Sequence, residues 1–255
     1  MKAIVLSAGQ GKRLLPLTED RPKCLVEISG LSILEWQLEV LYSCGIEEVV
    51  VVTGYKAEMV EELLRKKYGH KRPRTILNPD YAKTENIWSC WLAREEMKDP
   101  FILLNGDTLF EPAVLEKLLS SAFRDPITVT VNRKPSYDAD DMKVILKDGR
   151  LWRIGKDLPL EEVGAESIGL IAFTQEGGQI FRHYLEQVTR DPTYKKKWYL
   201  CVIDLIAKEY PVGVCDITGY AWCEIDYPKD LQDAKKVVSK IRESLIGQQV
   251  FHARL

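Results

Sequence analysis

Cationic side chains and small residues alternate in the loop that follows the first apolar run of the chain, Ala3 to Leu6. Small residues let backbone N–H groups approach a phosphate or a base closely, and the cations supply positive charge. The candidates for holding such a group are Leu6, Ala8, Gly9, Gly11, Lys12, Arg13, Arg21 and Lys23. A solvated basic loop with structural glycines is the alternative interpretation. The position directly after a buried strand favours the anion site.

Two familiar phosphate-binding loops do not fit this segment. A Rossmann fingerprint needs a third glycine where this chain has Leu14, and a Walker loop needs a glycine where it has Leu6. The loop therefore has to be interpreted from its own residues and its neighbours.

Two carboxylates far apart in the sequence each follow a predicted strand directly. Asp107 comes after the run 101–104, and Asp226 comes after the run 221–225. If both strands belong to one sheet, both carboxylates emerge at one edge and can share a Mg²⁺ ion, which prefers oxygen ligands. The alternative is that each carboxylate caps the element that follows it.

The first half of the chain alternates strand and helix patterns. Ser32 and Glu35 form a capping box that begins a helix ending near Gly45. Strands are predicted at 3–6, 49–52, 75–77 and 101–104, and further helices at 56–68 and 85–97. This alternation predicts a mostly parallel, Rossmann-like α/β sheet flanked by helices, with ligands beyond the carboxyl ends of its strands.

The second half has a different pattern. Strands at 142–146 and 150–154 flank Lys147-Asp148-Gly149, which predicts a small β-hairpin insertion. Further strands are predicted at 168–173, 212–215 and 221–225, and helices at 179–189, 201–209 and 228–245. Neither a repeat nor a linker interrupts residues 1–255, so we expect one domain.

Charge and apolar content exclude several partner classes. The 38 acidic and 36 basic residues give a formal net charge of −2, so we expect neither nucleic acid nor a membrane as a partner. The N-terminal apolar run is too short for a signal peptide, and we expect a soluble, cytoplasmic protein whose six cysteines are reduced. The sequence leaves open whether the chain forms a homo-oligomer.

Several blocks of sequence together carry a resemblance to a known superfamily. Leu6-Ser-Ala-Gly-Gln-Gly-Lys-Arg13 is followed by Arg21-Pro-Lys23, later by Asn105-Gly-Asp107, and finally by Glu224-Ile-Asp226. The chain resembles the nucleotidyltransferases that activate sugar 1-phosphates and phospho-alcohols with a nucleoside triphosphate. The run from Tyr81 to Ser89 is similar to bacterial choline-phosphate cytidylyltransferases.

The resemblance implies a nucleotide-diphospho-sugar transferase fold with a nucleotide-binding half, 1–110, and an acceptor-binding half, 111–255. It implies an enzyme that transfers CMP from CTP to a small phosphate- or phosphonate-bearing acceptor such as phosphocholine and releases pyrophosphate, with Mg²⁺ as cofactor. Arg13 would face the β- and γ-phosphates, and Lys23 would bridge the α-phosphate and the acceptor. The catalytic residues it implies are Arg13, Lys23 and Asp107, with Asp107 and Asp226 as metal ligands.

The base and acceptor sites are the least determined by sequence. Asn86 and Ser89 are candidates for the nucleobase and ribose, although Asn86 fits the N-cap region of its helix equally well. Acceptor candidates are Glu166, Lys156, Trp88 and Trp198. The tryptophans, with Tyr199 and Trp222, could offer aromatic faces to a cationic group, and Asp140, Asp141 or Glu166 could add countercharge. Core packing is the alternative for each tryptophan. The pattern around Lys156 departs from the Glu-Lys-Pro of relatives.

Other functions remain open on the sequence alone. A sugar-1-phosphate nucleotidyltransferase using UTP or dTTP is the nearest alternative. A glycosyltransferase of similar fold would usually carry Asp-x-Asp where this chain has Asn105-Gly106-Asp107. A nucleotide-binding homologue without catalysis is the remaining class, since a fold does not guarantee an activity.

Overall fold

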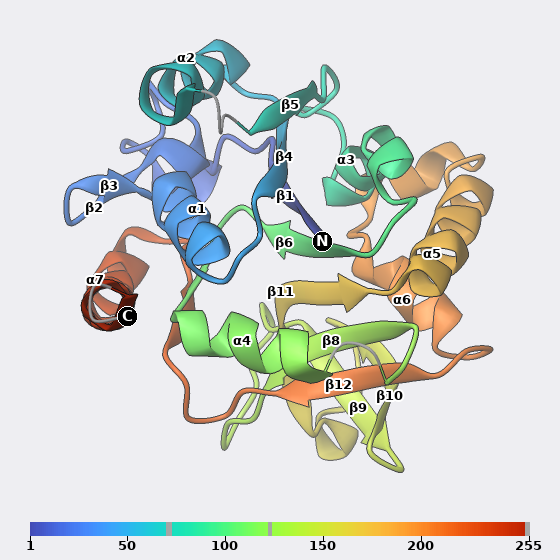
Figure 1. The fold of residues 1–255 in the computed structure, drawn as a ribbon. Helices are drawn as coiled ribbons and strands as arrows, with labels where there is room; N and C mark the ends of the chain where they lie inside the picture. The colour runs from blue at the N-terminus through green and yellow to red at the C-terminus, as the bar shows by residue number, and fades with distance from the viewer. Residues whose placement is uncertain (70–72, 122–123, 253–255) are drawn as a thin grey trace.

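A nine-stranded mixed sheet forms the centre of the computed structural model, which describes residues 1–69, 73–121 and 124–252 (Figure 1). Its strands are β1 (Lys2–Ser7), β4 (Glu48–Thr53), β5 (Arg74–Leu77), β6 (Phe101–Asn105), β8 (Ile127–Asn132), β9 (Lys143–Lys147), β10 (Arg150–Gly155), β11 (Ala165–Phe173) and β12 (Val212–Asp216). Their order is β10-β9-β11-β6-β1-β4-β5, and β8 pairs with both β11 and β12. The predicted Rossmann-like α/β fold is confirmed.

The N-terminal strands are parallel and end at one edge. β1 pairs in parallel with β4 and β6, so that Ser7 lies opposite Thr53 and Leu6 lies opposite Asn105. β11 runs antiparallel to β6 and joins this part to the strands of the second half. The carboxyl ends of the three parallel strands therefore form a common rim from which loops can bind a ligand.

Helices cover both faces of the sheet, as Figure 1 shows. The helices are α1 (Ile33–Ser43), α2 (Ala57–Tyr68), α3 (Asn86–Leu92), α4 (Pro112–Ser121), α5 (Gln175–Val188), α6 (Leu200–Ile206) and α7 (Leu231–His252). α1, α2, α4 and α7 pack in one apolar cluster, and α3, α5 and α6 pack in a second one. The predicted capping box of α1 is present, with Glu35 N–H donating to Ser32 Oγ.

Some elements differ from the sequence prediction. The helix expected over 85–97 ends at Leu92, and a short 3₁₀ turn, Arg94–Glu96, follows it. Among the helices and the strands of the central sheet, α4 and β8 were not predicted, although their sequences carry the signals: proline at the first turn of α4, and alternating β-branched residues in β8. The hairpin β9–β10 is confirmed, with Asp148 and Gly149 in the left-handed region of its turn.

Short elements complete the fold around the rim. β7 (Thr108–Phe110) pairs with β13 (Trp222–Glu224), and β2 (Glu27–Ile28) pairs with β3 (Leu31–Ser32). The described part of the chain holds no helix with the length and apolarity needed to cross a bilayer.

Candidate active site

A cavity of about 730 Å³ opens at the common rim of β1, β4 and β6. Most of the residues singled out from the sequence line it. They are Leu6, Ala8, Gly9, Gly11, Lys12, Arg13, Lys23, Asn86, Ser89, Asp107, Lys156, Trp198 and Asp226. The fold therefore brings together groups from both halves of the chain in one concave, highly charged space.

The loop after β1 is held in place by contacts with its glycines. Gly11 has φ +74°, and a Cβ there would lie 2.8 Å from Lys23 Cβ, so the Lys23 stem packs directly on this glycine. Thr18 Oγ1 donates to the Gly11 carbonyl at 2.9 Å. Tyr55 N–H, just past β4, donates to the Ala8 carbonyl at 3.0 Å. The loop is thus fixed to the rim before any ligand binds.

Lys23 lies between two carboxylates. Its Nζ is 2.7 Å from Asp107 Oδ2 and 2.7 Å from Asp226 Oδ1. Burial alone would lower the pKa of Lys23, but the charges of the two carboxylates outweigh it and raise the pKa. For Asp226 the directions are reversed. Burial alone would raise the pKa of this carboxyl group, but the positive charges of Lys23 and Arg13 hold it below its ordinary value. Lys23 and Asp226 are therefore both ionised near neutral pH.

The strand pairing that brings Asp226 to the Asp107 segment was not predicted from the sequence. We expected both to follow strands of one sheet, but Asp226 follows β13, which pairs only with β7 in a separate two-stranded sheet. Because β7 begins directly after Asp107, this pairing aligns the two segments, and Ile225 N–H donates to the Asp107 carbonyl at 3.1 Å. The carboxylates meet through a local antiparallel ribbon instead of a shared sheet edge.

Arg13 lies beside this cluster and reaches three acceptors. Its Nη2 is 2.7 Å from Asp226 Oδ2, and its Nη1 donates to Tyr227 Oη at 3.2 Å. The Asp140 carboxylate lies 3.6 Å from Nη1. The guanidinium is half-exposed toward the cavity, and its fork geometry suits phosphate oxygens.

The donor set of this cluster fits a hard cation. Asp107 Oδ1 is buried and has no hydrogen-bond partner among the described residues, so one acceptor oxygen is available. No group of three or more Asp, Glu, His or Cys side chains lies together as a metal site in the described part of the chain. Asp107 and Asp226 would be the residues that hold a Mg²⁺ ion here, because this ion prefers carboxylate, water and phosphate oxygens.

Asn86 and Ser89 lie on the cavity side of α3. Asn86 is the first residue of α3, and Glu85 holds the N-cap position without a side-chain hydrogen bond, so Asn86 is not the cap. The Asn86 Oδ1 accepts from Tyr199 N–H at 2.9 Å. Since a backbone N–H can only donate, this contact fixes the amide orientation. Ser89 Oγ accepts from Asn78 Nδ2 at 3.1 Å and is buried.

The acceptor candidates separate into two groups. Lys156 and Trp198 line the cavity, with Lys156 Nζ 4.4 Å from the centre of the Trp198 ring. Trp88 and Glu166 lie outside the cavity. Trp88 stacks on Trp91 at 4.4 Å between ring centres, because it lies on a different face of α3 from Asn86 and Ser89.

Glu166 belongs to a buried ion cluster instead of the cavity wall. Its Oε2 is 2.7 Å from Lys134 Nζ, and its Oε1 accepts from Asn132 Nδ2 at 3.0 Å. The next residue on β11, Ser167, lines the cavity. Successive side chains of a strand point to opposite faces, and the sequence-based choice was therefore one residue away from the cavity.

Glu224 is a cavity residue to which the sequence analysis assigned no role. Its side chain is accessible from the cavity, but many protein atoms surround its carboxyl group. The resulting loss of hydration, followed by the Asp107 and Asp226 charges, raises the pKa of Glu224 to about 8. The sequence did carry a signal that Glu224 lies in the cavity. Glu224 is two residues before Asp226, and alternate residues of an extended chain point to the same side.

The fold and the cavity define an α/β protein of the nucleotide-diphospho-sugar transferase fold. The solved structure of the CTP:phosphocholine cytidylyltransferase from Streptococcus pneumoniae matches with a TM-score of 0.76 at 25% identity, over 93% of this chain and 98% of that one. The chain belongs to the nucleotidyl transferase family, which it matches over residues 2–240.

Two curated relatives are similar over nearly the whole chain. The CTP:phosphoglutamine cytidylyltransferase of Campylobacter jejuni subsp. jejuni is 29% identical, over 91% of this chain and 98% of that protein. The CMP-5'-(3-aminopropyl)phosphonate synthase of Streptomyces rubellomurinus is 32% identical over 95% of this chain, which spans 40% of that protein's length. The resemblance seen in the sequence is confirmed at the level of the superfamily.

Proposed function

We propose that the protein is a Mg²⁺-dependent cytidylyltransferase that transfers CMP from CTP to a small acceptor bearing a phosphate or phosphonate group. One observation carries the proposal. Lys23 is held between Asp107 and Asp226, beside Arg13, at the rim of a cavity that Lys156 also lines. This arrangement has the charges needed for two phosphate-bearing ligands.

The chemistry needs no general base. An oxygen of the acceptor phosphate forms a bond to the α-phosphorus of CTP, and the bond from that phosphorus to the β-phosphate oxygen breaks, releasing pyrophosphate. A phosphomonoester loses its second proton with a pKa of about 6, so the attacking oxygen is already ionised at neutral pH. Catalysis then consists of holding two anions together and stabilising the transition-state charge.

The cations have distinct roles in this proposal. Arg13 binds the β- and γ-phosphates with its fork, and Lys23 contacts the α-phosphate and the incoming acceptor as a point charge. Lys156 binds the acceptor phosphate from the other side of the cavity. All three side chains line one cavity, which supports the assignment.

The remaining nucleotide contacts come from the loop after β1 and from α3. Gly9 allows the base and sugar to lie against backbone, and Asn86 and Ser89 line the same cavity. Asn86 directs its NH₂ group away from Tyr199 N–H, which leaves a donor for an acceptor atom of the base.

Asp107 and Asp226 would hold the Mg²⁺ ion. When bound, it would neutralise phosphate charge in the transition state and orient the triphosphate. The unpartnered Asp107 Oδ1 supports this role.

The choice of CTP and of the acceptor class rests on the relatives. Both curated relatives and the matched structure carry names that describe transfer from CTP or of CMP, with phosphoglutamine, an aminoalkyl phosphonate and phosphocholine as the other partner. Phosphocholine is the first acceptor to test, because Trp198 and several carboxylates line the cavity.

The test is pyrophosphate release with Mg²⁺ in a grid of nucleotides and acceptors. CTP, UTP, dTTP, ATP and GTP are crossed with phosphocholine, phosphoethanolamine, 2-aminoethylphosphonate, phosphoglutamine, inositol 1-phosphate and hexose 1-phosphates. We expect release with CTP and one acceptor that is not a sugar 1-phosphate. Release restricted to hexose 1-phosphates with UTP or dTTP would replace the proposal with the sugar-nucleotide alternative, and silence across the grid would contradict both.

A further inference from the structure

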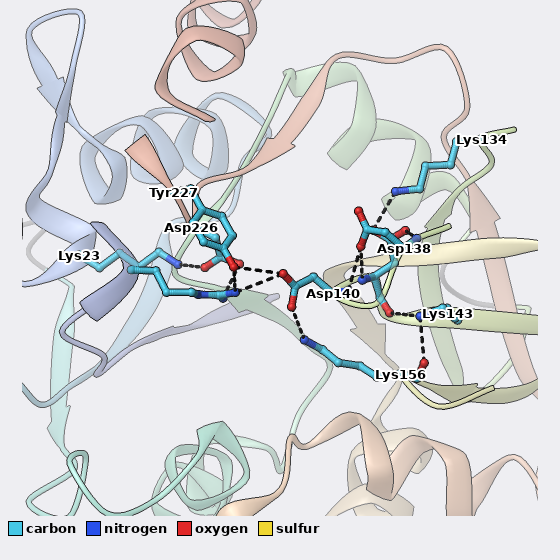
Figure 2. Close-up of polar contacts among 10 residues, drawn as sticks. Lys23, Lys134, Asp138, Asp140, Lys143, Lys156, Asp226 and Tyr227 are labelled. Carbon is cyan, nitrogen blue, oxygen red and sulfur yellow. Dashed lines mark hydrogen bonds and ion pairs between the residues drawn. The ribbon is translucent and has the colours of Figure 1, made fainter. Parts of the chain in front are cut away.

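Asp140 joins two cations that the proposed function assigns to different ligands. It lies in the segment between β8 and β9 and reaches across the cavity (Figure 2). Its Oδ2 is 3.6 Å from Arg13 Nη1 and accepts from Tyr227 Oη at 3.2 Å. Its Oδ1 is 3.6 Å from Lys156 Nζ. One carboxylate thus occupies the space between the cation assigned to the triphosphate and the cation assigned to the acceptor.

The backbone of this segment is anchored by contacts that do not involve the Asp140 side chain. Lys134 Nζ is 2.8 Å from Asp141 Oδ1 and 2.7 Å from Glu166 Oε2. Asp138 Oδ1 accepts from the backbone N–H of Asp140 at 2.9 Å. Figure 2 shows the dashed contacts at Lys134 and Asp138 within this segment, and together with the Glu166 ion pair they hold its backbone in place. The Asp140 side chain can therefore leave the two cations without unfolding the segment.

The ion pair of Asp140 with Arg13 is longer than the ion pair of Asp226 with the same cation. Arg13 is 2.7 Å from Asp226 but 3.6 Å from Asp140. Asp140 is also the most exposed member of the cluster, with 59% of its side chain accessible, compared with 19% for Asp226. Exposed ion pairs at this distance contribute little free energy. An incoming phosphate would displace Asp140 first.

We propose that Asp140 is an internal competitor for phosphate, which holds Arg13 and Lys156 in the ligand-free protein and is displaced when a triphosphate binds. A carboxylate and a phosphate use the same donors of arginine and lysine, so the two cannot occupy them together. Displacement from Arg13 also removes the carboxylate from Lys156, which frees that cation for the acceptor phosphate. This inference rests on the phosphate-binding roles proposed above for Arg13 and Lys156.

The test measures the binding of inorganic pyrophosphate by calorimetry at pH 7.5 and low ionic strength. Asp140→Asn keeps the shape of the side chain and removes its charge, and we expect it to bind pyrophosphate about threefold to tenfold more tightly than the unmodified protein. The difference should shrink at high salt, because the ion pairs are exposed.

Glu85→Gln is the matched control. Glu85 lines the same cavity and lies in the field of Lys156 and Arg13, but it forms no direct ion pair with either among the described residues. We expect it to change pyrophosphate affinity less than Asp140→Asn does. Equal tightening by both variants would mean that any lost negative charge suffices, and would overturn the competitor role. Unchanged or weaker binding in Asp140→Asn would overturn it as well.

Failure of this inference is distinguishable from failure of the proposed function. If the unmodified protein binds pyrophosphate and releases it from CTP, while Asp140→Asn binds equally well, only the competitor role is lost. If neither protein binds pyrophosphate or CTP, the phosphate site itself is absent and both proposals are contradicted.

Discussion

Lys23 Nζ and Asp226 Oδ1 lie 2.7 Å apart, although 203 residues separate them in the sequence. The same ammonium is 2.7 Å from Asp107 Oδ2, and its side chain is only 13% exposed. Breaking a largely buried pair leaves an uncompensated charge. The lysine is therefore fixed at the rim of the sheet, and in the proposed reaction this would provide the preorganisation that transition-state stabilisation requires.

Replacing Lys23 should impair turnover more than binding. We expect Lys23→Ala to lower kcat by about 10²-fold to 10³-fold, while the Kd for CTP rises by about tenfold or less, because other cations still hold the triphosphate. The measurement is pyrophosphate release together with calorimetric titration of CTP. Lys147→Ala, on the distant hairpin β9–β10, is the control and should behave as the unmodified protein. Normal turnover in Lys23→Ala would remove this lysine from the mechanism.

Replacing Asp107 should abolish the dependence of turnover on Mg²⁺. Asp107→Asn keeps the size of the side chain but removes one of the two carboxylates expected to bind the ion. We expect pyrophosphate release to fall to background at every Mg²⁺ concentration, while thermal unfolding shows a folded protein. Chelation of Mg²⁺ should silence the unmodified enzyme reversibly. An active, Mg²⁺-responsive Asp107→Asn protein would contradict the metal assignment.

Gly9 provides a test of nucleotide binding that does not disturb the fold. A Cβ at Gly9 would have no heavy atom within 4 Å. We therefore expect Gly9→Ala to leave the free energy of unfolding unchanged within about 0.5 kcal/mol. If the base or sugar lies against this glycine, the added methyl should weaken CTP binding by about tenfold, which calorimetry can measure. Unchanged affinity would place the nucleotide elsewhere in the cavity.

Replacing Gly106 by alanine should destabilise the fold, unlike the same replacement at Gly9. A Cβ there would lie 2.5 Å from both the Leu6 carbonyl and Ser7 Oγ, in the tight contact between the ends of β1 and β6. Gly106→Ala should lower the free energy of unfolding by about 1–3 kcal/mol in a denaturant titration, because backbone has to move. A variant as stable as the unmodified protein would show that the rim is less closely packed than these distances indicate.

Glu96 should make stability depend on pH below the neutral range. Its two oxygens each accept from Arg74 at 2.7 Å, and these hydrogen bonds, joined by the Lys2 contact, lower the pKa of Glu96 to about 2. A carboxylate with a depressed pKa stabilises the fold above its unfolded value of about 4.5 and loses this contribution as pH falls toward 2.

Chemical denaturation across pH tests this contribution. We expect Glu96→Gln to lower the free energy of unfolding by about 1–2 kcal/mol at pH 7, since the partly exposed Arg74 reduces the full effect, and by less at pH 3. The neighbouring Glu95→Gln is the control, because Glu95 makes exposed ion pairs and should have little effect. A loss that is the same at pH 3 and pH 7 would mean that packing, not charge, explains the change.

Local features were predictable because they depend on neighbouring residues. The capping box Ser32–Glu35, the hairpin turn at Asp148-Gly149 and the strands β1, β4 and β6 follow from short-range hydrogen bonding, turn geometry and apolar pattern. The loop after β1 carries its glycines and cations in one short stretch. α4 and β8 were not predicted, although they carry local signals of the same kind, a proline in the first turn and alternating β-branched residues.

The composition of the cavity was predictable only in part. The register of β11 decides that Ser167 lines the cavity and Glu166 lies behind it, and the helical position of Trp88 turns its ring onto Trp91. A one-residue difference reverses the direction of a strand side chain, so the sequence alone could not choose between these neighbours.

The sequence by itself determined which chemistry the chain can perform: a glycine-bearing cationic loop placed after a buried strand, and carboxylates at the ends of later strands. The tertiary structure decided how those groups meet. Asp226 approaches Asp107 because β13 pairs with β7, and Asp140 crosses to Arg13 because the segment before β9 is anchored on Lys134. Pairings across such distances depend on burial and packing of the whole chain, which no short stretch of sequence contains.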